Sequence, residues 1–311
     1  VFGIITAFDA PARQSLVVDL IDDPKDLGNA IALNSAIFNG ARLIGPAIAG
    51  ITIAAVGEGI CFLLNTASFV AVIFALLRIK IPSKPEIVQS VRFKESFIEG
   101  YQYTFRSVPI RLLIILLVAV SIFGMSYIVL LPAYAKEILH GNSDTLGYLM
   151  SALGAGALSA ALFMASRKTV LGLGKILSVS VILLGLSITF TSFSACFFLS
   201  IIVLFFGGVS MILSLSSVNT MLQTIADEDK RGRVMSFYAM ALMGTAPIGS
   251  LLIGSLGSKT GIINAILISG LCMVLAGIWF NFNLKSLRKY VRPIYRIKGI
   301  LPGLPDHMTI T

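Results

Sequence analysis

Long apolar stretches, separated by short polar turns, run along almost the whole chain. A membrane-spanning helix needs about 20 mostly apolar residues. One incomplete stretch covers about residues 1–18, and eight complete ones follow it. The complete stretches cover about residues 30–55, 58–78, 110–134, 145–166, 175–193, 196–222, 234–256 and 262–284. The pattern predicts an all-α transmembrane protein.

Two hydrophilic segments break this pattern. Residues 79–109 lie between two predicted spans, and residues 285–311 follow the last one. In the first segment aromatic residues recur every four positions, with charged residues between them: Phe93, Phe97, Tyr101 and Phe105. This spacing favours a helix that lies in the membrane interface and links the parts of the protein on either side.

The composition agrees with lipid, not water, as the solvent. Among the 311 residues, 56% are hydrophobic and only 13% are charged, and the mean hydropathy is +0.92. A soluble domain has about a quarter charged residues, and hydrophobic cores stop growing at about 250–300 residues. The first residue is Val1, inside an apolar stretch with no basic segment before it. We therefore expect an N-terminally truncated chain and no signal peptide.

Lysine and arginine gather in alternate loops, which sets the expected orientation. Of the 24 basic residues, 21 fall on the side that carries residues 79–109 and 285–311. Only Lys136 and Lys259 fall on the opposite side, and Arg42 lies within a span. The basic side is therefore expected in the cytoplasm, in a multi-pass protein of the cytoplasmic membrane. The net charge of +9 does not indicate nucleic-acid binding, because it is spread over separate loops beside apolar spans.

A repeat with an offset of 204 residues relates two glycine-rich spans. Seven aligned positions are identical in the two copies: Ile21 and Ile225, Asp23 and Asp227, Gly28 and Gly232, Gly40 and Gly244, Ile44 and Ile248, Gly45 and Gly249, and Gly50 and Gly254. The two copies are six predicted spans apart, so they cross the membrane in the same direction. Parallel repeats of this kind relate the halves of transporters that are built from two six-helix halves.

The repeat divides the chain into four parts. Residues 1–78 are expected to be the remainder of an N-terminal half, helices 4–6, and residues 79–109 the cytoplasmic linker. Residues 110–284 are expected to form a C-terminal half, helices 7–12, and residues 285–311 a cytoplasmic tail. About nine of twelve helices would then be present, with about three missing upstream.

Three segments carry a resemblance to a known family. Residues 8–50 resemble the fourth helix, the loop after it and the fifth helix of major facilitator exporters; their sequence is FDAPARQSLVVDLIDDPKDLGNAIALNSAIFNGARLIGPAIAG. The most similar branch holds enterobactin exporters and macrolide-efflux proteins. DEDKRGRVMS, at 227–236, is similar to the branch's loop between helices ten and eleven, and RFKESFIEGYQYTFRSVPIRLLI, at 92–114, to its central linker. The resemblance implies the major facilitator fold of two six-helix halves.

The span at 30–55 holds a stripe of small residues next to a proline. Ala41, Gly45 and Ala49 recur every four residues, so another helix can approach closely. Pro46 removes a backbone donor and bends the helix. The pattern up to Gly50 is similar to the fifth-helix motif GxxxGPxxGG of drug–proton antiporters, with alanine at two of its glycines. The resemblance implies a kinked contact between halves that seals the cavity, and ordinary helix packing is the alternative.

Two charged residues lie inside or beside predicted spans. Burying Arg42 costs about 2.5–3.5 kcal/mol on insertion scales, so it should face a cavity or pair with an acid. Asp9, in the preceding helix, is the nearest candidate partner. A buried carboxylate has a raised pKa, so Asp9 could carry a proton, or it could pair with Arg13 one turn on.

A dense mixed-charge loop covers residues 227–233. Its candidate site residues are Asp227, Arg231 and Arg233. The loop is either simply solvated or forms salt bridges between helices that hold one conformation and break in another.

Motifs of other function classes are missing from the sequence. Cys61, Cys196 and Cys272 lie singly in apolar segments, which is typical of packing residues. There is no GxxxxGK[ST] phosphate loop, which disfavours an ATP-driven pump. We expect no enzyme activity, no cofactor and no metal site.

These features predict a secondary active transporter. It would export a small amphiphilic molecule, such as a drug, macrolide or siderophore, by alternating access coupled to protons. Its expected partners are that substrate, protons and the bilayer, and it is expected to act as a monomer. An importer or lipid flippase of the same fold, a membrane-embedded enzyme or receptor, and a fragment without transport activity remain alternatives.

Overall fold

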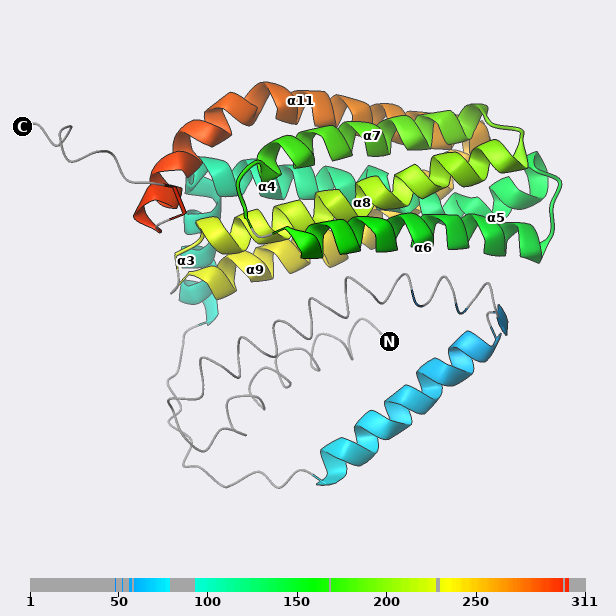
Figure 1. The fold of residues 1–311 in the computed structure, drawn as a ribbon, viewed down its shortest axis with the longest axis horizontal. Helices are drawn as coiled ribbons and strands as arrows, with labels where there is room; N and C mark the ends of the chain where they lie inside the picture. The colour runs from blue at the N-terminus through cyan, green and yellow to red at the C-terminus, as the bar shows by residue number, and fades with distance from the viewer. Residues whose placement is uncertain are drawn as a thin grey trace, which may run out of the picture. The chain divides into compact units, whose positions relative to one another are not determined.

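The computed structural model describes residues 59–78, 93–167, 169–227, 230–298 and 300–301, together with Ile48, Thr52, Val56 and Gly57. All of the regular secondary structure in this described part is helical (Figure 1). The chain forms two compact units, Val1–Ser90 and Val91–Thr311. The predicted spans at 1–18 and 30–55 lie outside the described residues, apart from Ile48 and Thr52.

The first unit contains one described spanning helix, Gly59–Arg78, as the apolar stretch at 58–78 predicted. At its end the guanidinium of Arg78 lies over the ring of Phe74, 4.9 Å from the ring centre. The cation is thereby held against an aromatic face at the boundary of the span.

In the described part of the second unit there are six spans and a shorter helix. The shorter helix is α3, Phe93–Arg106. The first span is interrupted and consists of α4 Val108–Ala119, η2 Val120–Met125, η3 Ser126–Leu130, α5 Leu131–Ala133 and η4 Tyr134–Ile138. The next three are α6 Ser143–Ser166, α7 Leu173–Phe193 and α8 Phe197–Ile225. The fifth consists of α9 Arg231–Ala239, η5 Met240–Gly244 and α10 Ala246–Thr260, and the sixth is α11 Ile262–Ile297.

The described residues hold seven helices that are long and apolar enough to cross a membrane. They correspond to seven of the eight complete spans predicted from the sequence, and their ends agree to within a few residues in six cases. The exception is α11, which was expected to end at residue 284 and runs on to Ile297. The beginning of the predicted tail at 285–311 is therefore helical.

Glycines bring the long helices of the second unit close together. Figure 1 shows α6, α8, α7 and α11 side by side in that order. A Cβ atom on Gly208 of α8 would overlap the carbonyl of Leu153 on α6, and one on Gly185 of α7 would lie 2.5 Å from the backbone nitrogen of Val274 on α11. Backbones that approach this closely gain the van der Waals contact that holds helices together in lipid.

Most buried hydroxyls inside the unit bond to one another or to backbone carbonyls, whereas those of Thr104 and Ser217 have no partner among the described residues. The hydroxyl of Tyr134 lies 2.7 Å from both the carbonyl oxygen of Ser194 and the hydroxyl of Ser200. The hydroxyls of Ser180 and Ser214 are 2.9 Å apart and join α7 to α8. Such partners are needed because lipid offers no hydrogen bonds of its own.

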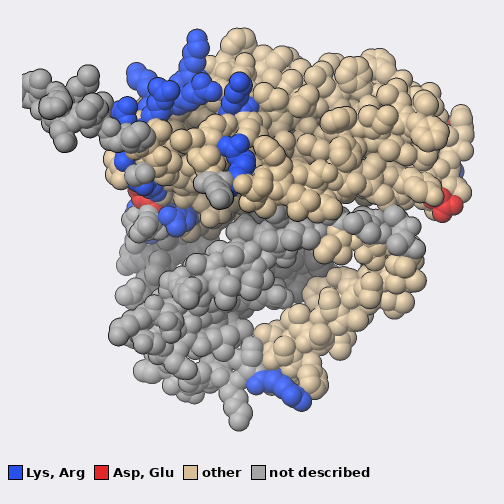
Figure 2. All heavy atoms as spheres, viewed as in Figure 1, with Lys and Arg blue, Asp and Glu red and all other residues tan. Residues whose placement is uncertain are grey.

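Basic residues gather at one end of the second unit. Figure 2 shows Lys and Arg concentrated where α3 lies and where α11 ends, with few at the opposite end. The helix bounds place these residues at this end, called the basic end below: Arg106, Arg111, Arg167, Lys175, Lys230, Arg233, Arg288 and Arg292. The distribution agrees with the sidedness predicted from the alternate loops.

Candidate functional site

Five of the eight predicted site residues lie outside the described part of the chain. They are Asp9, Arg42, Gly45, Pro46 and Gly50. Their proposed roles stay predictions. The other three, Asp227, Arg231 and Arg233, lie at the basic end, where α8 ends and α9 begins.

Helix α3 supplies the acidic partner of this region. Glu99 of α3 forms an ion pair with Arg233, with 2.7 Å between Oε2 and Nη1, and a second one with Lys230. The hydrogen bond from Lys230 and then that from Arg233 hold the pKa of the Glu99 carboxyl below its ordinary value. The carboxylate is half exposed, so solvent weakens these attractions. Its contribution is to fix where α3 docks.

Close packing of backbone and rings supports the ion pairs. A Cβ atom on Gly100 would lie 3.3 Å from the Cβ of Arg233, so α3 and α9 approach each other closely at this point. The ring of Phe237 on α9 packs edge-on against Phe105, with 6.2 Å between ring centres, and 6.4 Å from Tyr101. Part of the aromatic stripe predicted for a helix in the membrane interface therefore packs against α9.

Asp227 is held by two hydrogen bonds to a single hydroxyl. The hydroxyl of Tyr103 donates to Oδ2 of Asp227 at 2.9 Å, and the backbone N–H of Asp227 donates to the hydroxyl oxygen of Tyr103 at 3.1 Å. Nearby, the ammonium of Lys298 donates to the carbonyl oxygens of Thr224 and Ala226, both at 2.8 Å. The last carbonyls of a helix need such donors. The end of α8 is thus tied to α3 and to the residue after α11.

The three predicted loop residues do not form a cluster of their own. Asp227 and Arg233 each bond to α3, whereas Arg231 is exposed and has no ion pair within the described residues. Sequence reasoning missed Glu99 and Tyr103 as partners, although both lie in the linker segment that it singled out. The sequence shows that both residues are polar, but it does not show their partners, which lie 124 residues or more away along the chain.

A second feature lies within the membrane-spanning part. Helices η2 and η5 are π-helical turns in two different spans. The hydroxyl of Ser121 in η2 donates to the carbonyl oxygen of Leu242 in η5 at 2.8 Å. The hydroxyl of Ser269 on α11 donates to the carbonyl oxygen of Phe123 at 2.6 Å. Side chains thereby bond carbonyls within the interruptions, and such turns often mark functional positions in helices.

Gly249 lies next to these interruptions and is the repeat counterpart of Gly45. A Cβ atom on it would lie 2.7 Å from the Cα of Ile122 and would overlap the hydroxyl of Ser126. Helix α10 therefore contacts η2 backbone to backbone. The small residue at this repeat position makes a tight interhelix contact in the second unit, which is what the sequence pattern predicted for the first copy.

Comparison with known proteins settles the family. The sequence model described as transmembrane secretion effector matches residues 1–292. The chain belongs to this family of major facilitator transporters. The superfamily predicted from the motifs is confirmed, and with it the helical fold.

Curated relatives of this major facilitator protein share about a quarter of its residues. A staphyloferrin A transporter of Staphylococcus aureus is 26% identical over 288 residues, which are 92% of this chain and 71% of the relative. The multidrug efflux pump Tap of Mycolicibacterium fortuitum is 25% identical over 258 residues, 81% of this chain and 62% of the relative. An uncharacterized transporter of Bacillus subtilis, YfmI, is 22% identical over 289 residues, 91% and 70% of the two chains.

Within the described residues no group of three or more His, Cys, Asp or Glu side chains could hold a metal ion. The family is one of transporters, so the arrangement of this chain is best interpreted as machinery for moving a molecule through the membrane.

Proposed function

We propose that this protein exports a small amphiphilic molecule across the cell membrane by alternating access, in exchange for protons. The family match over residues 1–292 carries the proposal, and the efflux pump among the relatives supports the direction. A drug, macrolide or siderophore fits the expected substrate class. We further propose that the protein acts as a monomer and has no enzymatic activity.

Two structural features would serve such a cycle. The contact between α3 and α9, held by Glu99, Lys230 and Arg233, lies at one end of the unit and can form in one conformation and break in another. The paired interruptions η2 and η5 lie where two spans can bend against each other. Interfaces that switch between discrete contacts are typical of alternating access.

Arg42, Gly45, Pro46 and Gly50 are proposed to form the conformational contact of the fifth helix, and Asp9 is a candidate proton carrier. Arg42→Gln tests this directly, because a basic group inside a span is costly unless it serves a cavity or an ion pair. Lys259→Gln is the matched control, because Lys259 lies in the last turn of α10 and is exposed.

The test measures ethidium accumulation in bacterial cells that lack their own efflux pumps, with the gene read from its own start codon. Expressing cells should accumulate less dye than cells with an empty vector, and a protonophore should abolish the difference. Arg42→Gln should abolish it too, and Lys259→Gln should not. Equal accumulation with and without the gene would contradict export of this substrate class, and higher accumulation would favour an importer, as the staphyloferrin A relative leaves open.

A further inference from the structure

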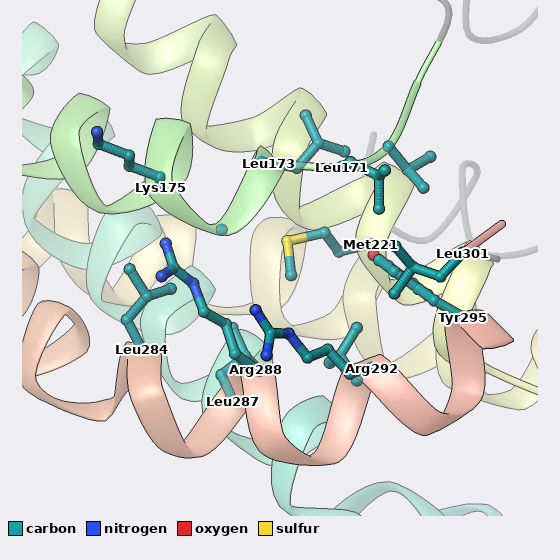
Figure 3. A pocket seen from close by; sticks show the side chains of 14 residues that line it. Leu171, Leu173, Lys175, Met221, Leu284, Leu287, Arg288, Arg292, Tyr295 and Leu301 are labelled. Carbon is teal, nitrogen blue, oxygen red and sulfur yellow. The ribbon is translucent and has the colours of Figure 1, made fainter. Parts of the chain in front are cut away.

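A cavity of about 310 Å³ opens at the basic end of the second unit. It lies between the N-terminal turn of α7 and the part of α11 beyond residue 284 (Figure 3). Neither the contact between α3 and α9 nor the interruptions in the spans contribute to it. Its lining combines cationic and apolar side chains, which is the composition expected for an amphiphilic anion.

Two arginines define the charge of this cavity. Arg288 and Arg292 are one turn apart on α11, and Figure 3 shows both side chains on the side of the helix that faces α7. No carboxylate of the described residues forms an ion pair with either of them. Like charges at this spacing repel each other, so an anion between the two guanidinium groups would stabilise the arrangement. Guanidinium groups match phosphate oxygens with paired hydrogen bonds.

The opposite wall adds to the positive potential. Helix α7 begins after Gly172, which has a φ of +84° and provides no side-chain cap, and no acidic residue lies in the first turn. Backbone N–H groups of the first turn bond to the carbonyl oxygens of Val170 and Gly172, so it is the helix dipole that makes this end favourable for an anion. Lys175, in the same turn, also lines the cavity.

The remaining lining is apolar and indicates that the anion carries hydrocarbon. Leu284, Leu287 and Val291 of α11 are buried and form one side, and Met221 of α8 forms another. Leu171, before the first turn of α7, also lines the cavity and is 37% exposed, so part of the apolar lining is open to the surroundings. A soluble phosphate would leave this apolar wall unused, whereas a lipid would not.

We propose that this cavity binds the phosphate headgroup of an anionic phospholipid, with its acyl chains lying along α11. Basic pockets between spanning helices on the cytoplasmic side are suited to such headgroups. The site would be independent of the transported molecule, and it would fix the end of α11 in the leaflet where the basic loops lie.

Lipid retention by purified protein tests the proposal. The protein is prepared in phosphatidylcholine nanodiscs that contain phosphatidylglycerol, extracted into detergent, and analysed by native mass spectrometry for bound lipid. The double variant Arg288→Gln, Arg292→Gln should retain about tenfold less phosphatidylglycerol, because each charged hydrogen bond contributes substantially. All four of these side chains are exposed, but only Arg288 and Arg292 line the cavity, so the control Lys289→Gln, Arg296→Gln removes the same charge outside it and should retain as much lipid as the unchanged protein.

Further variants and measurements complete the test. Arg288→Lys, Arg292→Lys keeps the charge but not the paired geometry, so its retention should be intermediate, and circular dichroism checks that each variant is folded. Equal loss in the cavity and control variants would overturn the proposal, as would equal retention of phosphatidylcholine. Displacement of the lipid by millimolar inorganic phosphate would identify a soluble anion as the ligand and would also overturn it.

Discussion

The hydroxyl of Ser121 donates a 2.8 Å hydrogen bond to the carbonyl oxygen of Leu242, across 121 residues of chain. Both residues lie in π-helical turns, one in each of two neighbouring spans. A π-turn disturbs the regular backbone bonding of a helix, and lipid cannot replace a missing donor. The bond between them joins the two spans at the turns where the regular α-helical bonding of each is interrupted.

Ser121→Ala should destabilise the second unit by about 1 kcal/mol, the scale of hydrogen bonds between spanning helices. The substitution leaves the carbonyl of Leu242 without this donor. Reversible unfolding in mixed micelles measures the effect. Ser255→Ala is the control, because Ser255 is exposed on α10 and bonds only within its own helix turn. Equal stability of the two variants would show that the interhelix bond contributes nothing.

Gly249→Ala and Gly254→Ala form a matched pair on α10, since both glycines belong to the repeat. A Cβ atom at 249 would lie 2.7 Å from the Cα of Ile122, whereas one at 254 has nothing within 4 Å. Overpacking of this kind costs about 1–3 kcal/mol. Alanine should therefore destabilise at 249 and be neutral or stabilising at 254, measured by the same unfolding assay. A similar loss at both positions would mean that the contact with η2 is not the cause.

The spans could be predicted from the sequence because their length and apolarity are local properties. The interruptions could not. Residues 120–125 lie within one continuous apolar stretch, and their π-turn has contacts with η5 and α11 that no local pattern contains. The family could be predicted because its motifs are continuous in the chain.

The C-terminal part of α11 has a helical sequence pattern, but it was predicted as a tail because the spans were identified by hydropathy. Leu287, Val291 and Tyr295 are buried and recur every four residues, which is a helical pattern. The surrounding lysines and arginines lower the hydropathy, so a criterion based on membrane spans stops at residue 284. The charged partners of the candidate site, Glu99 above all, were hidden for a different reason, because they come together only through the fold.

Glu99→Gln should loosen the contact between α3 and α9. The substitution keeps the size of the side chain but removes the charge that attracts Lys230 and Arg233. Hydrogen–deuterium exchange in α3 should become faster, with little change in the spanning helices. Glu137→Gln removes a carboxylate that has no ion pair among the described residues, and should leave exchange in α3 unchanged. Unchanged exchange in Glu99→Gln would mean that ring packing and the bonds between Tyr103 and Asp227 hold α3 without the ion pairs.

The same contact should depend on pH. The pKa of Glu99 is lowered in the folded protein, so its stabilising effect is complete above the ordinary glutamate pKa of about 4.3 and is lost as the pH falls through the lower folded value. Exchange in α3 should therefore be constant between pH 7 and 5, after correction for intrinsic rates, and should rise relative to the rest of the unit below pH 4. The Glu99→Gln variant should lack this rise. A rise of the same size in the variant would assign it to other carboxylates.

Tyr103→Phe tests whether the end of α8 is tied to α3 through one hydroxyl. That oxygen donates to the carboxylate of Asp227 at 2.9 Å and accepts its backbone N–H at 3.1 Å, so phenylalanine removes two bonds and keeps the ring. The loss should be about 1 kcal/mol in local stability, since the site is near solvent and water replaces part of what is lost. Exchange of the amides at 225–227 should rise about fivefold. Tyr101→Phe is the control, because the Tyr101 ring contacts Phe105 and Phe237 while its hydroxyl has no partner among the described residues. If exchange at 225–227 is unchanged in Tyr103→Phe, or rises equally in both variants, the Tyr103 hydroxyl does not position Asp227, and the ion pairs of Glu99 and the ring contacts of α3 hold the α8–α9 junction.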